Sequence, residues 1–360
     1  MYRSFEVKNF RCFRELKLTD LDRVNLIAGK NNVGKTALLE AIFLHCGAYN
    51  PELTLRVNAF RGIEAIKIEL PGWTETPWDA LFNQFDASRI VELKGINEQN
   101  VLRILRLKLI RQTHELTRIY QTQRVFDKLE ESAPLSTASS QVLELESVEI
   151  EQSQSYYLIL DAKGIRSAPI PPPPPFPAIF LPARGRIPIA EDASRFGKLE
   201  LIGQQDLVLK ALQVIEPRLR RLAVVVVGEV PVIHGDIGLG RLMPLPLMGE
   251  GMARLTSLVL AIANTPKGVV LVDEIENGLH HSVLPKVWRA IGETARAFNT
   301  QVFATTHSFE CIVAAHRAFS EGEGYDFRLH RLEQVDDFIR VVTYDQETVD
   351  AAIEMGLEVR

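Results

Sequence analysis

An eight-residue stretch near the start of the chain has the residue types and spacing that bind phosphate. Two glycines bracket four variable residues, and a lysine and a threonine follow, in the order Gly29-Lys30-Asn31-Asn32-Val33-Gly34-Lys35-Thr36. The glycines let backbone N–H groups turn toward an anion that a side chain would obstruct. We expect Lys35 to reach the β- and γ-phosphates of a nucleotide and Thr36 to offer its hydroxyl to Mg²⁺.

A second pair of chemical groups lies far downstream. Four apolar residues, 269–272, run into two adjacent acids, Asp273 and Glu274. A buried strand would deliver Asp273 to its carboxyl end, where the carboxylate can hold the Mg²⁺ shell. Neighbouring side chains on a strand point to opposite sides, so Glu274 need not share the metal. We expect Glu274 to orient and deprotonate the attacking water as general base.

A third apolar run ends in a histidine. Residues 302–305 predict a buried strand, and Thr306 and His307 follow it. Ligands gather at the carboxyl ends of parallel strands, so a neutral His307 imidazole is placed to contact the γ-phosphate and sense its loss. Taken alone, a histidine at a strand end is more often structural, and that alternative stays open at this point.

The elements around these groups are those that must position them. Residues 24–28 form an apolar run ending at the first glycine, and residues 37–44, beginning at Ala37, read as a helix. The helix would present its positively polarised N-terminal end to the same anion. Strand, glycine loop and helix in this order predict a nucleotide-binding site.

The remaining pattern predicts an α/β fold class. Alternating strands and helices after residue 199 indicate a parallel sheet covered on both faces. Residues 1–50 and 181–360 would form this P-loop head, with helices expected at 201–215, 253–263, 283–298 and 349–355 and buried strands at 223–227, 269–272 and 301–305. Residues 51–180 would form a β-rich arm that ends in the proline run 171–175, a stiff linker. Its expected strands are 66–70, 90–93, 101–110, 142–150 and 156–160, although the 102–109 piece also fits a helix.

Bulk properties exclude several classes of protein. The net charge of −5 argues against a protein that coats nucleic acid by bulk charge. Three separated cysteines, Cys12, Cys46 and Cys311, predict reduced thiols that are small buried residues. The charged N-terminus lacks a signal-peptide core, and no apolar stretch is long enough to cross a bilayer. We therefore expect a cytoplasmic protein that is not embedded in a membrane.

Together these motifs resemble the ABC-type ATPases of the SMC and RecF kind, and in particular the stand-alone OLD-type ATPases of bacterial phage-defence and repair operons. Residues 7–14 are similar to that class's first-strand motif, residues 273–280 to its extended Walker B motif and D-loop, and His307 to its switch histidine. The resemblance implies that Arg11 lies near the phosphates and Phe13 near the nucleoside. It also implies ATP rather than GTP, since no guanine-specific NKxD motif is visible.

The signature motif of this class departs from the usual pattern. It normally begins with serine, but the matching stretch is Leu247-Met248-Gly249-Glu250-Gly251-Met252. Gly249 and Gly251 would still offer backbone donors at a helix start. The resemblance implies an ATP-dependent homodimer in which these glycines cap the nucleotide of the partner. Too few residues follow His307 for a Toprim nuclease, so we expect any nuclease effector to be a separate chain. Gln84 is the candidate for the class's Q-loop.

Contact with DNA is a further hypothesis. One basic cluster contains Arg103, Arg106, Lys108 and Arg111, and a second spans residues 217–221. Such clusters are usually solvated or paired with nearby acids. Two other functions also stay open: the ATPase subunit of an ABC transporter, and a module that binds ATP with little hydrolysis.

Overall fold

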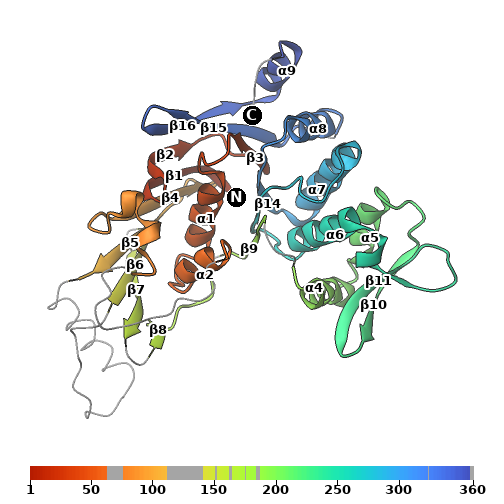
Figure 1. Ribbon diagram of the computed structural model, residues 1–360, viewed down its shortest axis with the longest axis horizontal. Helices are drawn as coiled ribbons and strands as arrows, with labels where there is room; N and C mark the ends of the chain where they lie inside the picture. Colours follow the sequence, from red (N-terminus) through yellow and green to blue (C-terminus); the bar gives the residue numbers. More distant parts are fainter. Residues whose placement is uncertain are drawn as a thin grey trace.

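The computed structural model describes residues 1–62, 76–111, 141–150, 152–161, 164–174, 176–183, 187–322 and 324–356. Figure 1 shows a central sheet with an antiparallel sheet and helices α1 (Lys35–Cys46) and α2 (Leu53–Ala59) on one side, and a group of helices with a β-hairpin on the other. The C-terminal hairpin forms the upper edge of the central sheet in this view, and the C-terminal helix lies above it. No helix of the described ranges is long and apolar enough to cross a membrane.

The central sheet carries the predicted site. Its strand order is β16-β15-β3-β14-β13-β9, and all but β16 run parallel. The strands are β3 (Val24–Gly29), β9 (Ala178–Leu181), β13 (Val269–Val272), β14 (Gln301–Thr305), β15 (Phe327–Val335) and β16 (Phe338–Tyr344). Every residue of β3, β13 and β14 is buried, which explains their mainly apolar sequences.

Alternate residues of these strands face two different hydrophobic cores. Val270 and Val272 pack into the core with the helices of the C-terminal half, while Val269 and Leu271 pack into the core with α1. The first core is built by α6 (Glu250–Ala263), α7 (Leu284–Phe298) and α8 (Phe309–Ser320), joined by α4 (Ile189–Leu201), α5 (Gln205–Gln213) and α9 (Gln346–Glu354). Burial on both faces fixes the carboxyl edge of the sheet as the place where a site can open.

The second core joins α1 (Lys35–Cys46) to a seven-stranded antiparallel sheet of order β2-β1-β4-β5-β6-β7-β8. Its strands are β1 (Tyr2–Phe10), β2 (Phe13–Leu18), β4 (Val91–Asn97), β5 (Leu102–Ile110), β6 (Gln141–Glu149), β7 (Gln152–Asp161) and β8 (Gly164–Ala168). The ambiguous 102–109 segment is therefore a strand. Because β1 pairs with β4, this sheet joins the two segments that the sequence analysis divided at residue 50.

Short elements connect these parts. They are α2 (Leu53–Ala59) and the 3₁₀ turns η1 (Asp79–Leu81), η2 (Asn83–Phe85), η4 (Leu245–Met248) and η5 (His281–Val283). Residues 171–174 of the proline run form neither helix nor strand, while the expected strand 66–70 and Pro175 lie outside the described residues.

Two expectations for the C-terminal half were wrong. The valine run 223–227 belongs to β10 (Arg221–Val227), which pairs with β11 (Val230–Asp236) and β12 (Met243–Pro244) in a separate antiparallel sheet. Val226 is 67% exposed, so this strand is not buried. The helix expected at 201–215 is the shorter α5, which begins only at Gln205, because Leu201 ends α4 and Gly203 takes a positive φ of 69° between the two helices.

Candidate nucleotide-binding site

The structure brings together the two residues that the sequence assigns to magnesium. Oγ1 of Thr36 lies 3.0 Å from Oδ1 and 3.0 Å from Oδ2 of Asp273. Only β14 separates their strands β3 and β13, so the loop after β3 and the end of β13 open at one edge of the sheet. Thr305, at the end of β14, donates its hydroxyl to Oδ1 of Asp273 at 2.7 Å. Burial raises the pKa of the Asp273 carboxyl, whereas the hydrogen bonds from Thr305 and Thr36 act in the opposite direction.

Lys35 lies beside these groups, and its amine is hydrogen-bonded to backbone carbonyl groups of the P-loop. Nζ donates to the carbonyl oxygens of Gly29 at 2.7 Å and Lys30 at 3.0 Å. Burial lowers the pKa of Lys35, whereas the nearby acids Asp273 and Glu274 act in the opposite direction. An arriving phosphate would offer the amine a stronger, charged acceptor than these two carbonyl groups.

The two loop glycines have no room for a side chain. Gly29 has a φ of 144°, and a Cβ there would meet the Leu332 carbonyl oxygen at 2.7 Å. Gly34 has a φ of 100°, and a Cβ there would meet Cys12 Sγ at 2.6 Å. The backbone of this loop is therefore held in a shape that only glycine permits. Cys12 is exposed, which corrects its predicted burial, whereas Cys46 and Cys311 are buried as expected.

The four residues between the glycines differ in their exposure to solvent. Lys30, Asn31 and Asn32 are exposed, and Asn32 has a φ of 65°. Val33 is only 4% exposed and, with Ala37 at the start of α1, packs into the core beneath the loop. Buried anchors at Val33 and Ala37 hold the loop on the sheet and leave its outer face open to a ligand.

Glu274 is oriented by a turn rather than by the alternation of a strand. β13 ends at Val272, and Glu274 has a φ of 46°, so the expected strand alternation does not extend to it. Its backbone N–H donates to Thr305 Oγ1 at 2.8 Å, and its Oε2 accepts from Asn277 Nδ2 at 2.7 Å. Asn277 lies in the extended Walker B stretch, but the sequence analysis assigned it no role.

His307 stands at the same edge with 49% of its side chain exposed. Its Nδ1 lies 3.2 Å from Glu276 Oε1, which also accepts from the His307 backbone N–H at 3.0 Å and from Thr306 Oγ1 at 2.8 Å. Glu276 therefore ties the end of β14 to the turn after β13. This carboxylate also had no role in the sequence analysis, since only the folded chain brings it to His307.

Gly249 and Gly251 lie at the start of α6. This helix packs into the first core, whereas α1 packs into the second core on the other face of the central sheet. Gly249 caps the helix with a φ of 114°, and a Cβ on Gly251 would stand 3.5 Å from the Gly278 carbonyl oxygen. One turn further, Arg254 Nη2 donates to the carbonyl oxygens of Asp273 at 3.2 Å and Glu274 at 3.5 Å. The signature helix is thus bonded to the Walker B turn through Arg254, an arginine in an apolar helix that the sequence analysis passed over.

Arg11 and Phe13, which the resemblance places near the nucleotide, make contacts within the protein. Arg11 Nε lies 2.6 Å from Oε2 of Glu40, a fully buried carboxylate of α1 that also pairs with Arg61 at 2.7 Å. Arg11 is committed to this ion pair, whose loss of one partner would cost about 3–5 kcal/mol. Phe13 is 1% exposed, and its ring packs beneath Gly34, so it presents no face to a nucleoside.

Gln84 is not at the Walker B edge. It lies in η2 beside the turn between β1 and β2, where it lines a cavity with Arg11 and Cys12. On the side away from β14, β13 pairs with β9, whose last residue, Leu181, accepts a hydrogen bond from the Asp273 backbone N–H at 2.9 Å. β9 was not among the expected strands.

The assembled groups fit a magnesium–nucleotide complex. The Asp273 carboxylate and the Thr36 hydroxyl meet beside Lys35. The adjoining loop leaves no room for a side chain at either of its glycines. Within the described ranges, no group of three or more His, Cys, Asp or Glu could hold a metal ion unaided. Mg²⁺ is commonly held by one or two protein ligands together with waters and substrate phosphates. Thr36 and Asp273 would be the protein ligands, and waters and nucleotide phosphates would supply the rest.

Comparisons with known proteins agree with this geometry. Over 98% of both chains, the protein is 22% identical to a Helicobacter pylori protein named "ATP/GTP phosphatase". A 48-residue stretch is 50% identical to "Uncharacterized protein MJECL10" of Methanocaldococcus jannaschii, covering 13% of this chain and 22% of that one. The fold is similar to an SMC head bound to the C-terminal winged-helix domain of ScpA, with a TM-score of 0.50, 14% identity and coverage of 97% and 99% of the two chains.

These similarities confirm the ABC/SMC-like ATPase class and the α/β P-loop fold. A family model matches residues 24–312, a range that begins with β3 and includes the P-loop, the Walker B turn and His307. The chain therefore belongs to the family described as "AAA domain, putative AbiEii toxin, Type IV TA system".

Proposed function

We propose that this protein binds Mg-ATP at the P-loop edge of the central sheet and hydrolyses its γ-phosphate bond. The observation that carries the proposal is the contact between Thr36 and Asp273, which unites the P-loop with the Walker B strand end at 3.0 Å. The name of the Helicobacter pylori relative, "ATP/GTP phosphatase", supports a nucleotide hydrolase.

Each group has a role that follows from its position. Lys35 would exchange the carbonyl oxygens of Gly29 and Lys30 for β- and γ-phosphate oxygens. A bound magnesium ion supplies charge neutralisation on the phosphates, and Thr36 and Asp273 would hold it. Asn277 occupies Oε2 of Glu274 and leaves Oε1 to accept a proton from the attacking water. His307, half exposed at the end of β14, would contact the γ-phosphate.

The site would be completed by a second copy of the chain. A Cβ on Gly251 would meet the turn at Gly278, one on Gly249 would meet open space, and neither would meet the P-loop of the same chain. The start of α6 would therefore cap a nucleotide held by the partner, through backbone donors alone because the serine is absent. Arg254 would report this contact to the Asp273–Glu274 turn, to which it is hydrogen-bonded.

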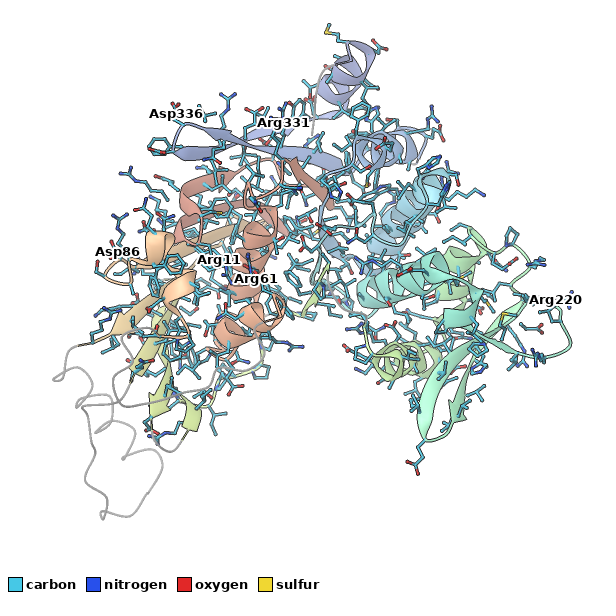
Figure 2. The ribbon with its side chains drawn as sticks, in the orientation of Figure 1. Arg11, Arg61, Asp86, Arg220, Arg331 and Asp336 are labelled. Atoms are coloured by element: carbon cyan, nitrogen blue, oxygen red, sulfur yellow. The ribbon has the colours of Figure 1, made fainter. Side chains whose placement is uncertain are left out.

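Such a dimer would act as a switch, because a closed form that prefers ATP to ADP opens on hydrolysis. We propose that it works in phage defence or DNA repair with a separate effector such as a nuclease. The first basic cluster is a poor DNA site, since Arg103 pairs with Glu149 at 2.9 Å and Arg106 with Glu92 at 3.0 Å. A DNA contact is better sought near Arg220 at the start of the β10–β11 hairpin, labelled in Figure 2.

The direct test of the proposed function is phosphate release by the purified wild-type protein. We expect steady-state release of phosphate from ATP with Mg²⁺ and none with an excess of EDTA, because Thr36 and Asp273 need the metal to engage the phosphates. Binding of ATP measured by calorimetry without any release of phosphate would instead indicate a module that holds the nucleotide without hydrolysing it.

A further inference from the structure

The C-terminal β15–β16 hairpin reaches the P-loop in a way that the phosphate chemistry does not require. β15 runs parallel to β3 and pairs Leu332 with Gly29, the last residue of β3. The rest of β15 and the hairpin turn therefore project past the carboxyl end of β3, into the space beside the loop. β16 returns along β2, so the hairpin turn stands over the β1–β2 turn. Figure 2 shows Asp336, at the hairpin tip, and Asp86 on the same side of the molecule.

A cavity of about 580 Å³ opens between these elements. Three segments line it: residues 11–14 of the β1–β2 turn, residues 83–89, and residues 334–338 of the hairpin. Its wall touches the P-loop, because Cys12, which lines the cavity, lies against Gly34. The volume lies within the range of about 300–1,000 Å³ that is usual for small-molecule sites.

The charges around this cavity favour a neutral group over another phosphate. Arg11 is paired with Glu40, and Arg89 with Asp86 at 2.8 Å. The Arg14 guanidinium lies 5.6 Å from the centroid of the Phe338 ring, and Asp337 stands beside it in the same lining. The positive and negative charges thus nearly balance, and an anion would gain little here.

Phe338 and Asp337 supply the two kinds of contact that a nucleoside needs. Phe338 is 55% exposed, and its ring, which the Arg14 guanidinium approaches at 5.6 Å, could stack on a base with the face turned away from Arg14. Within the described ranges, the Asp337 carboxylate makes no hydrogen bond or ion pair and is free to accept from ribose hydroxyls. The Gln334 amide nitrogen already donates to the Asp336 carbonyl oxygen at 3.3 Å.

We propose that this cavity is the nucleoside subsite, in which Phe338 stacks on the purine and Asp337 binds the ribose. The inference rests on the proposed function, since the triphosphate must lie in the P-loop. It gives to the C-terminal hairpin the role that buried Phe13 cannot perform. Stacking on an aromatic ring tolerates any base, so the subsite discriminates little between ATP and GTP.

The test compares nucleotides with inorganic tripolyphosphate by calorimetry in the presence of Mg²⁺. Phe338→Ala is expected to weaken ATP and GTP binding about tenfold each, as loss of one stacked base does, and to leave tripolyphosphate unchanged. Phe85→Ala is the matched control, because Phe85 is 73% exposed in the neighbouring η2 turn but does not line the cavity. It should leave all three affinities unchanged.

A second variant tests the ribose contact. The wild type should bind ATP more tightly than 2′,3′-dideoxy-ATP, and Asp337→Ala should bind both equally. An ATP affinity unchanged in Phe338→Ala, or an equal loss for tripolyphosphate, would overturn the subsite. If the wild type binds tripolyphosphate as tightly as ATP, the subsite fails while the P-loop assignment stands. If it binds neither ligand, the proposed function fails and this inference fails with it.

Discussion

Lys35→Ala is expected to weaken the binding of Mg-ATP by about a hundredfold or more. Lys35 is the cation in the P-loop next to the Thr36–Asp273 pair, and its amine is held at 2.7 Å from the Gly29 carbonyl oxygen, ready to be turned onto phosphate. A charge-assisted hydrogen bond of this kind contributes up to about 3 kcal/mol, which is more than a hundredfold in affinity. Calorimetric titration with Mg-ATP measures the loss directly.

The matched control removes a lysine that has no part in the site. Lys198 lies exposed on α4, and Lys198→Ala changes the net charge by the same amount. Its ATP affinity should equal that of the wild type. An unchanged affinity in Lys35→Ala itself would mean that the glycine loop is a structural turn and not a phosphate site.

Glu274→Gln is expected to bind ATP normally and to lower its turnover by about 10²- to 10⁴-fold, the usual contribution of a general base. Glutamine has the shape of glutamate and can still accept the hydrogen bond from Asn277, so the turn after β13 should keep its form. What it lacks is a carboxylate that can take a proton from water. Single-turnover phosphate release, measured beside ATP affinity, separates the two effects.

Glu293→Gln provides the comparison for this variant. Glu293 is exposed on α7, away from the Walker B turn, and its substitution should leave turnover unchanged. Wild-type turnover in Glu274→Gln would contradict the assignment, and the base would then have to be another group at the carboxyl edge of the sheet.

The parts of the fold that the sequence predicts are those fixed by local patterns. β3, β13 and β14 are buried on both faces, so each is mainly apolar, and each was predicted within a residue or two. The P-loop is equally local, since its glycines are required by the positive φ values of Gly29 and Gly34. A parallel sheet then brings these strand ends to one edge without further information.

The remaining features depend on contacts between distant segments. β9 has only four residues and follows the prolines, so nothing local marks it as a core strand. The valines of β10 have strong strand propensity, but propensity does not show which sheet a strand joins or that Val226 stays exposed. The Glu276–His307 and Arg254–Asp273 contacts, and the burial of Phe13, likewise follow from tertiary packing alone.

The measurement that tests the central claim most directly is the solution mass of Glu274→Gln with and without Mg-ATP, by light scattering after gel filtration. Because this variant should hold ATP without hydrolysing it, the account predicts a monomer that becomes a dimer only when Mg-ATP is present. That result would show that Gly249 and Gly251 close the site of the partner without a signature serine. A mass that is the same with and without Mg-ATP would contradict the nucleotide-gated switch.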